Sequence, residues 1–145
     1  ILVGLAVALL AVRIGVTLAK RSAPAGDMIR WTTPEEGLRL AAETGKPVLL
    51  DFTAEWCAPC HILDAEGFRN PAIARLVNER YVAIRVVDRQ QEEGRNRPAV
   101  EALQRRYGVR GFPTVVFADA RGGERGRMEG FRGREEFERV MERAR

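Results

Sequence analysis

Residues 48–60 read VLLDFTAEWCAPC, an apolar run followed within a few positions by two cysteines. Positions 48–52 have the nearly continuous apolar character of a strand buried on both faces. Cys57 and Cys60 are the only cysteines in the chain, and a C-x-x-C pair beside a strand–helix–strand pattern indicates redox chemistry. The stretch therefore predicts a redox-active dithiol. The alternatives are a buried structural disulfide and two inert thiols.

The two thiols are expected in the first turn of a helix. Only a thiolate attacks a disulfide, and the pKa of a free cysteine is about 8.5. Unpaired amides and the macrodipole at a helix N-terminus lower that pKa. We therefore expect Cys57 to be an exposed nucleophile. The more buried Cys60, one turn further on, would resolve the mixed disulfide by attacking the Cys57 sulfur. Pro59 suits a first helical turn, where its missing N–H has no intrahelical partner.

Asp51 is the one charged residue within the apolar run. Burial raises the pKa of a carboxyl group, so we expect Asp51 to take or return a proton as Cys60 reacts. The alternatives are an exposed acid at the end of the strand and an acid paired with Arg85.

A second motif, Gly111-Phe112-Pro113-Thr114, opens a later apolar run with proline. Proline cannot donate to a strand ladder, so this is an unusual place for it. A cis peptide bond between Phe112 and Pro113 would turn the backbone toward the thiols. The alternative is a trans proline at an ordinary strand start.

The rest of the chain alternates strands and helices. Thr33-Pro34 is a typical helix start, and Gly45 a typical helix end. The predicted strands are 28–31, 48–53, 81–87, 114–117 and 124–128; the predicted helices are 33–45, 57–65, 71–77, 99–107 and 133–144, with a polar loop at 88–98. This order predicts an α/β fold of three α/β/α layers, a mixed sheet with helices on both faces.

Composition indicates one globular domain with a short appendage. The chain has 145 residues, 46% of them hydrophobic and 30% charged, with a net charge of +4. Its basic residues alternate with acidic ones and are not interleaved with aromatic residues, so no nucleic-acid surface is predicted.

Residues 1–19 are apolar except for Arg13 and Thr17, and Lys20-Arg21 follow. A helix of this length can cross a bilayer. We expect an N-terminal transmembrane helix within residues 1–21, a linker at 22–27 and a folded domain at 28–145. A cleaved signal segment and a buried helix are the alternatives. Because the sequence starts at Ile1, further spans could precede it. A two-cysteine domain behind an apolar leader is expected on the extracytoplasmic side, although Lys20-Arg21 alone would favour the opposite orientation.

The motifs together resemble the thioredoxin superfamily over residues 28–143. Within it the chain is most similar to the C-terminal periplasmic domain of membrane thiol:disulfide interchange proteins of the DsbD type. The matching positions are Lys46-Pro47, Asp51, Ala54-Glu55-Trp56-Cys57, Asn70-Pro71, Gly108-Val109, Gly111-Phe112-Pro113-Thr114 and Gly130-Phe131.

The resemblance implies that Cys57 and Cys60 cycle between dithiol and disulfide, with no cofactor and no metal. It implies protein disulfides and dithiols of the cell envelope as partners, an upstream membrane electron donor, and a location at the inner membrane facing the periplasm. It places six residues along a groove for partner disulfides: Trp56, Ala58, Pro59, Phe112, Pro113 and Gly130. Two departures from thioredoxin are His61 in place of lysine, and Ile84 or Arg85 in place of the lysine beside the buried acid.

Two other functions fit parts of the sequence. C-x-x-C-H, ending at His61, is the attachment pattern of c-type haem, with Met128 or Met141 as a second axial ligand. A non-catalytic binding module could use the same fold, whereas a zinc site lacks a fourth ligand.

The motif also predicts the direction of electron flow. Strong oxidants stabilise their thiolate, often with a cation inside the motif. Ala58 and Pro59 supply none, and the nearby acids Glu55 and Asp51 oppose thiolate formation. We therefore predict a reductant or electron relay.

Overall fold

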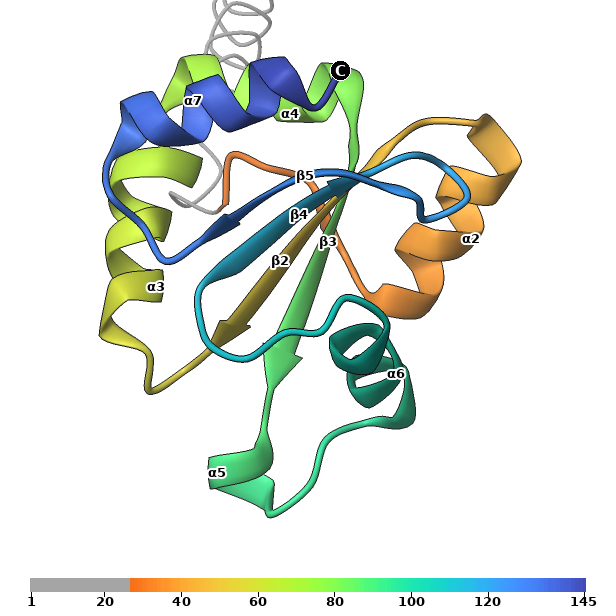
Figure 1. Ribbon diagram of the computed structural model, residues 1–145, viewed down its shortest axis with the longest axis vertical. Helices are drawn as coiled ribbons and strands as arrows, with labels where there is room; N and C mark the ends of the chain where they lie inside the picture. The colour runs from red at the N-terminus through yellow and green to blue at the C-terminus, as the bar shows by residue number, and fades with distance from the viewer. Residues whose placement is uncertain (1–26) are drawn as a thin grey trace, which may run out of the picture.

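A computed structural model describes residues 27–145 of the chain, and Figure 1 shows a five-stranded sheet between two layers of helices. The strands are β1 (Trp31–Thr32), β2 (Val48–Ala54), β3 (Val82–Asp88), β4 (Thr114–Ala118) and β5 (Glu124–Glu129). The helices are α2 (Pro34–Thr44), α3 (Ala58–Leu63), the π-helix η1 (Asp64–Phe68), α4 (Pro71–Arg80), α5 (Gln90–Glu93), α6 (Pro98–Arg106) and α7 (Arg134–Arg143). The predicted three-layer α/β/α fold is confirmed.

The sheet has the order β1-β3-β2-β4-β5. Strands β1 and β2 lie parallel to β3, whereas β4 is antiparallel to β2 and to β5, so the sheet is mixed as predicted. Strand β2 occupies the centre of the sheet. All of its residues except Thr53 are buried, because a layer of helices covers each face of the sheet.

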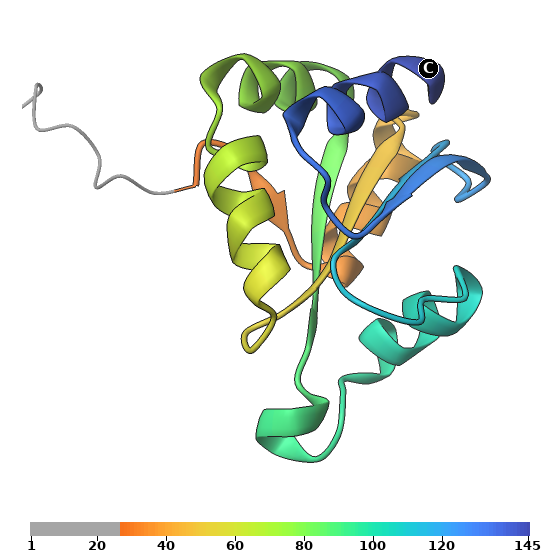
Figure 2. The ribbon, with the colours of Figure 1, turned by 60° about the vertical axis from the view of Figure 1, so that its left-hand side comes forward.

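Two core clusters fill the space between the layers. One lies against α3, η1, α4 and α7, and the other against α2 and α6; Figures 1 and 2 show these helices on opposite faces of the sheet. Leu49 of β2 belongs to the first cluster, and Leu50 and Phe52 to the second. Successive side chains of β2 therefore alternate between the two faces, as in any strand.

The helix boundaries follow the capping residues seen in the sequence. Thr33 caps α2 by accepting the Glu36 amide at 3.3 Å, and Gly45 ends it in the left-handed conformation (φ 70°). Asn70 caps α4 through its side-chain oxygen, which accepts the amides of Ala72 and Ile73 at 3.0 and 3.2 Å.

The predicted edge strand is present, but its predicted bounds, 28–31, are wrong, because β1 contains only Trp31 and Thr32. The side chain of Asn78 holds the preceding backbone instead: its oxygen accepts the Arg30 amide at 2.9 Å, and its nitrogen donates to the Met28 carbonyl at 2.9 Å. These bonds to α4 replace strand pairing.

Other predicted boundaries also differ from the observed ones, mostly by one to three residues. The helix predicted to end at residue 65 continues as η1 to Phe68. Strand β3 begins one residue late, since the Tyr81 amide still bonds to Val77 at the end of α4. The predicted polar loop at 88–98 contains the short helix α5.

The predicted transmembrane helix and most of the predicted linker fall within residues 1–26, outside the described residues. Within residues 27–145, every helix is too short or too polar to cross a membrane.

Candidate active site

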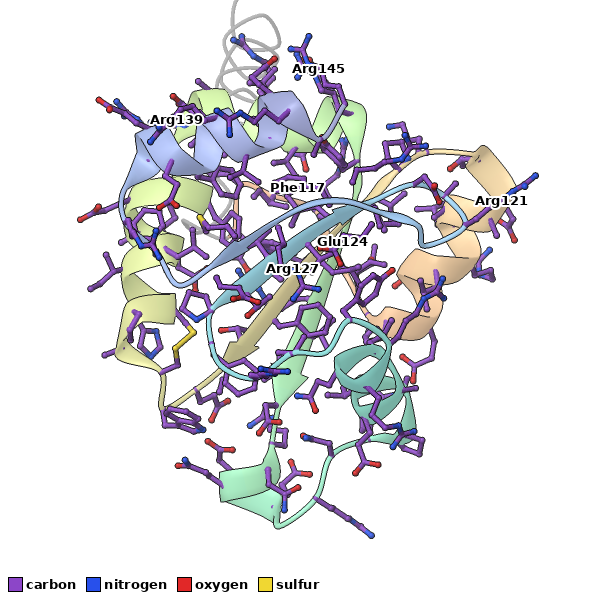
Figure 3. All side chains as sticks on the ribbon, in the orientation of Figure 1. Phe117, Arg121, Glu124, Arg127, Arg139 and Arg145 are labelled. Atoms are coloured by element: carbon purple, nitrogen blue, oxygen red, sulfur yellow. A yellow bond between two sulfur atoms is a disulfide. The ribbon has the colours of Figure 1, made fainter. Side chains whose placement is uncertain are left out.

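The two cysteines lie where β2 passes into α3. The chain turns through Glu55 and Trp56, and the Cys57 amide bonds to the Ala54 carbonyl at 3.2 Å. Cys57 has an extended backbone and caps α3, with its sulfur accepting the Cys60 amide at 3.2 Å. The Cys57 and Cys60 sulfurs are joined in a disulfide, the yellow bond at the start of α3 in Figure 3. The predicted strand-to-helix placement of the pair is confirmed.

The expectation that Cys57 is exposed is wrong, since its exposed fraction is 2%, and that of Cys60 is 3%. Both sulfurs pack with Ala54 beneath the partly buried ring of Phe112. Capping the helix and bonding to Cys60 turn the Cys57 sulfur toward α3 rather than toward solvent.

The predicted cis bond between Phe112 and Pro113 is present. Phe112 links two parts of the predicted groove, because it packs on the cysteines and its ring lies 6.0 Å from that of Trp56, edge to face. The amide of Gly130, which has a φ of 75°, donates to the Pro113 carbonyl at 2.8 Å. Ala58 and Pro59 are exposed in the first turn of α3, and half of the Trp56 surface is exposed.

Asp51 lies beneath this surface, in the middle of β2. It is two residues after Leu49 and so faces the same core, on the side of α3 and η1. Its exposed fraction is 2%; Oδ2 accepts Arg85 Nε at 3.2 Å, while Oδ1 has no hydrogen-bond partner among the described residues. Burial raises the pKa of Asp51 from 3.8 to about 7; the nearby charge of Asp64 adds to this, and Arg85 opposes it.

Two of the interpretations of Asp51 therefore hold together: it is a buried acid with a raised pKa, and it is paired with Arg85. The exposed alternative is wrong. The pairing follows from register, because Asp51 and Arg85 are opposite each other on β2 and β3. Arg85, one of the two residues named above in place of thioredoxin's lysine, thus lies beside the buried acid.

Arg85 also contacts residues that the sequence did not single out. Its Nη2 donates to Asp64 at 2.6 Å, its Nη1 is 3.8 Å from Asp27, and its guanidinium lies 4.1 Å from the centre of the Trp31 ring. The spacing of Asp64, one helical turn after Cys60, was a usable signal for placing it on the same side of the helix. No sequence signal placed Trp31 near Arg85, because only the pairing of β1 with β3 brings the two residues together.

The residues named for haem do not fit that group. Haem attachment requires both cysteine sulfurs, which here are bonded to each other, and the His61 ring bonds through Nε2 to the Glu55 carbonyl at 2.8 Å. Met128 and Met141 are buried in the core between the sheet and α7. Within residues 27–145, three or more His, Cys, Asp or Glu side chains nowhere form a group suited to a metal ion.

A three-layer fold with a cysteine pair capping a helix, a cis proline beside it and a buried acid below defines a thiol:disulfide oxidoreductase. The family model described as "Thioredoxin-like domain" matches residues 34–145. The chain belongs to this thioredoxin-like family.

Similar proteins agree with this assignment. A thiol:disulfide interchange protein DsbD of Cronobacter sakazakii is 36% identical over 94 residues, which are 63% of this chain and 15% of that protein. The matched part is thus a small fraction of the relative's length. The solved C-terminal domain of DsbD from Neisseria meningitidis, in the oxidised form, has a TM-score of 0.62 and 28% identity, covering 77% of this chain and 91% of that one. A thioredoxin from Thermus thermophilus has a TM-score of 0.65 and 31% identity, covering 79% and 85%.

Proposed function

We propose that the protein is a membrane-anchored, extracytoplasmic disulfide reductase or electron relay that passes electrons to disulfides of envelope proteins. The Cys57–Cys60 disulfide at the start of α3 carries the proposal, together with the similarity to DsbD. The apolar residues 1–19 would be the anchor, and a membrane protein upstream would supply electrons.

The reaction uses the two thiols in sequence. In the reduced protein the Cys57 thiolate attacks one sulfur of the partner disulfide, and the other partner sulfur leaves as a thiolate. The Cys60 thiolate then attacks the Cys57 sulfur, which closes the ring and releases the second partner thiolate. Two electrons pass to the partner, and the two protons of the dithiol balance the thiolates it gains.

Asp51 is proposed to accept the proton of Cys60 as that thiol reacts. A carboxyl with a pKa of about 7 can both bind and release a proton near neutral pH. Oδ1, which has no hydrogen-bond partner within residues 27–145, would receive this proton, since Arg85 occupies the other oxygen.

The groove around Pro113 is proposed to hold the partner chain in an extended conformation, by backbone pairing beside the cis proline. Trp56 and Phe112 provide an aromatic edge next to the disulfide, which suits the apolar surface around a partner's cysteines.

Equilibration of the purified domain with glutathione or dithiothreitol tests the direction of electron flow. We expect a reduction potential near the value of about −270 mV found for thioredoxin, because the motif holds no cation that would stabilise the thiolate strongly. A potential near the value of about −120 mV typical of strong periplasmic oxidants would contradict a reducing role. The reduced domain should also reduce insulin, a convenient protein disulfide.

Thiol labelling in intact spheroplasts tests the location. With the full chain expressed and reduced in its host, a membrane-impermeant maleimide is expected to label Cys57 without lysis. A cysteine-free cytoplasmic protein carrying one engineered surface cysteine serves as the control, which must label only after lysis. Labelling of Cys57 only after lysis would place the domain in the cytoplasm and reject the extracytoplasmic proposal.

A further inference from the structure

The connection between β3 and α6, residues 89–97, is held in place by a buried carboxylate. Asp88, at the end of β3, accepts the Asn96 side chain at 2.6 Å, the Gln104 side chain at 2.8 Å and the Gln90 amide at 3.0 Å. Asn96 in turn accepts the Arg89 amide at 2.6 Å. The connection is therefore tied at both ends to one anchor and is a defined part of the fold rather than a free loop.

This connection reaches the loop that carries the nucleophile. Arg89 Nη1 lies 2.8 Å from the carboxylate of Glu55, two residues before Cys57. In Figure 1 the connection, with α5, extends beyond the ends of β2 and β3, at the same end of the sheet as the start of α3. The Asp88 anchor thus fixes the starting point of Arg89, and Arg89 fixes the Glu55 carboxylate.

A second contact holds the backbone of the same residue. His61 Nε2 lies 2.8 Å from the Glu55 carbonyl, and a carbonyl only accepts, so this nitrogen carries a proton. Glu55 is therefore held twice, through its side chain by Arg89 and through its backbone by His61. Cys57 lies between Glu55 and His61 in the chain, so both contacts limit movement around the sulfur.

The side-chain contact has an electrostatic consequence. A carboxylate near a thiolate disfavours the thiolate and raises the pKa of the thiol. While Arg89 pairs with Glu55, the Glu55 carboxylate points toward residues 89–97, and the positive charge of Arg89 balances its negative charge. The two side chains are 40% and 59% exposed, so water screens the pair and it contributes little to the stability of the fold. Its effect is expected at the neighbouring thiol.

We propose that Arg89 and His61 are positioning residues that act through Glu55 to keep the Cys57 thiol acidic, which makes residues 88–97 part of the redox site. The proposal rests on the proposed function only in taking Cys57 as the attacking thiol. It assigns a role to a segment that the sequence predicts to be only a polar loop.

The test measures the pKa of the Cys57 thiol in the reduced full chain, from the pH dependence of iodoacetamide alkylation at about 0.15 M salt, where distant charges are screened. Arg89→Ala is expected to raise this pKa by about half a unit, because the Glu55 carboxylate becomes free to approach the sulfur. Alkylation at pH 7 then slows about threefold.

The matched control is Arg95→Ala, which removes the same charge from the same connection. Arg95 makes no ion pair within residues 27–145, so its loss should leave the Cys57 pKa unchanged. Arg89→Lys should leave the Cys57 pKa close to its native value, since lysine can still pair with Glu55. In a Glu55→Gln background, Arg89→Ala should have no more effect than Arg95→Ala.

The backbone contact is tested in the same assay. His61→Leu removes the donor and should raise the Cys57 pKa, whereas His61→Gln keeps a side-chain donor and should restore at least part of the native value. Equal effects of the two variants would reject the role of His61.

An effect of Arg89→Ala that matches Arg95→Ala, or that persists in Glu55→Gln, would overturn the role of Arg89. Alkylation requires a reduced thiol that the small reagent can reach, but no partner disulfide. A protein that fails to reduce insulin but shows the expected coupling would reject the proposed function and leave this inference standing.

Discussion

Replacement of Cys57 by serine is expected to lower insulin reduction to the uncatalysed rate. Serine is nearly the same size, but its hydroxyl is not ionised near neutral pH and does not attack a disulfide. Cys60→Ser is expected to behave differently, because Cys57 can still attack while no thiol remains to resolve the product. This variant should accumulate a covalent complex with its partner, at up to one partner chain per molecule.

The two variants control for each other. Each removes the same disulfide, which closes a very short ring, so each loses the same small constraint on the unfolded chain. A difference between them therefore reports the roles of the thiols rather than stability. Non-reducing electrophoresis, with and without dithiothreitol, detects the trapped complex.

Each other outcome has a definite meaning. Trapping by Cys57→Ser and not by Cys60→Ser would reverse the assigned roles. If Cys57→Ser binds its partner unchanged and disulfide exchange is not reduced, the exchange does not depend on Cys57. That result would contradict the assignment as an enzyme and favour a non-catalytic binding module.

Asp51→Asn is expected to stabilise the folded protein strongly at pH 8. The pKa of Asp51 is about 7 in the folded state and has an ordinary value of 3.8, so the folded protein binds this proton more tightly than the unfolded chain does. Between these two pKa values the free energy of unfolding falls as the pH rises, because the charged form is the one that burial disfavours. Above pH 7 Asp51 is charged in both states, and the free energy of unfolding is lowered by the full cost of burying that charge.

The size of the effect follows from the pKa difference. About three pKa units correspond to about 4 kcal/mol. Arg85 loses one carboxylate in the variant but keeps Asp64 at 2.6 Å, so we expect a net gain of roughly 2 to 3 kcal/mol. Below pH 4 the gain should vanish, since the Asp51 carboxyl is protonated in both states. Urea unfolding measured from about pH 3 to pH 8 tests both expectations.

Asp88→Asn is the matched control, and it is expected to change the free energy of unfolding in the opposite direction. Burial favours the protonated form of Asp88, but hydrogen bonds from Gln104, Asn96 and the Gln90 amide outweigh it and lower its pKa. Asp88 therefore contributes stability above its unfolded pKa, which is lost as the pH falls through its folded pKa. Its replacement should destabilise the protein at neutral pH. Equal stability of Asp51→Asn and the unchanged protein at pH 8 would contradict the buried, charged state of Asp51.

The local parts of this site were readable in the sequence. The cysteine pair after a buried strand, the proline within Gly111-Phe112-Pro113-Thr114 and the two ends of α2 each depend on residues close together in the chain. Backbone preferences and burial patterns act over such short spans, so these predictions agree with the structure. The mixed sheet and its two helical layers followed from the alternation of strands and helices, whereas the strand order β1-β3-β2-β4-β5 is known only from the structure.

The partners of those residues depend on long-range contacts, which only the folded chain defines. The register of β2 and β3 pairs Asp51 with Arg85, and β1 adds Trp31 to the same guanidinium. Likewise, the Asp88 anchor carries Arg89 to Glu55 across 34 residues of sequence. A charged side chain has many possible partners in the chain, and strand register and connection length select one. The placement of the two thiols is therefore local, whereas the charges proposed to tune them are brought together by tertiary packing.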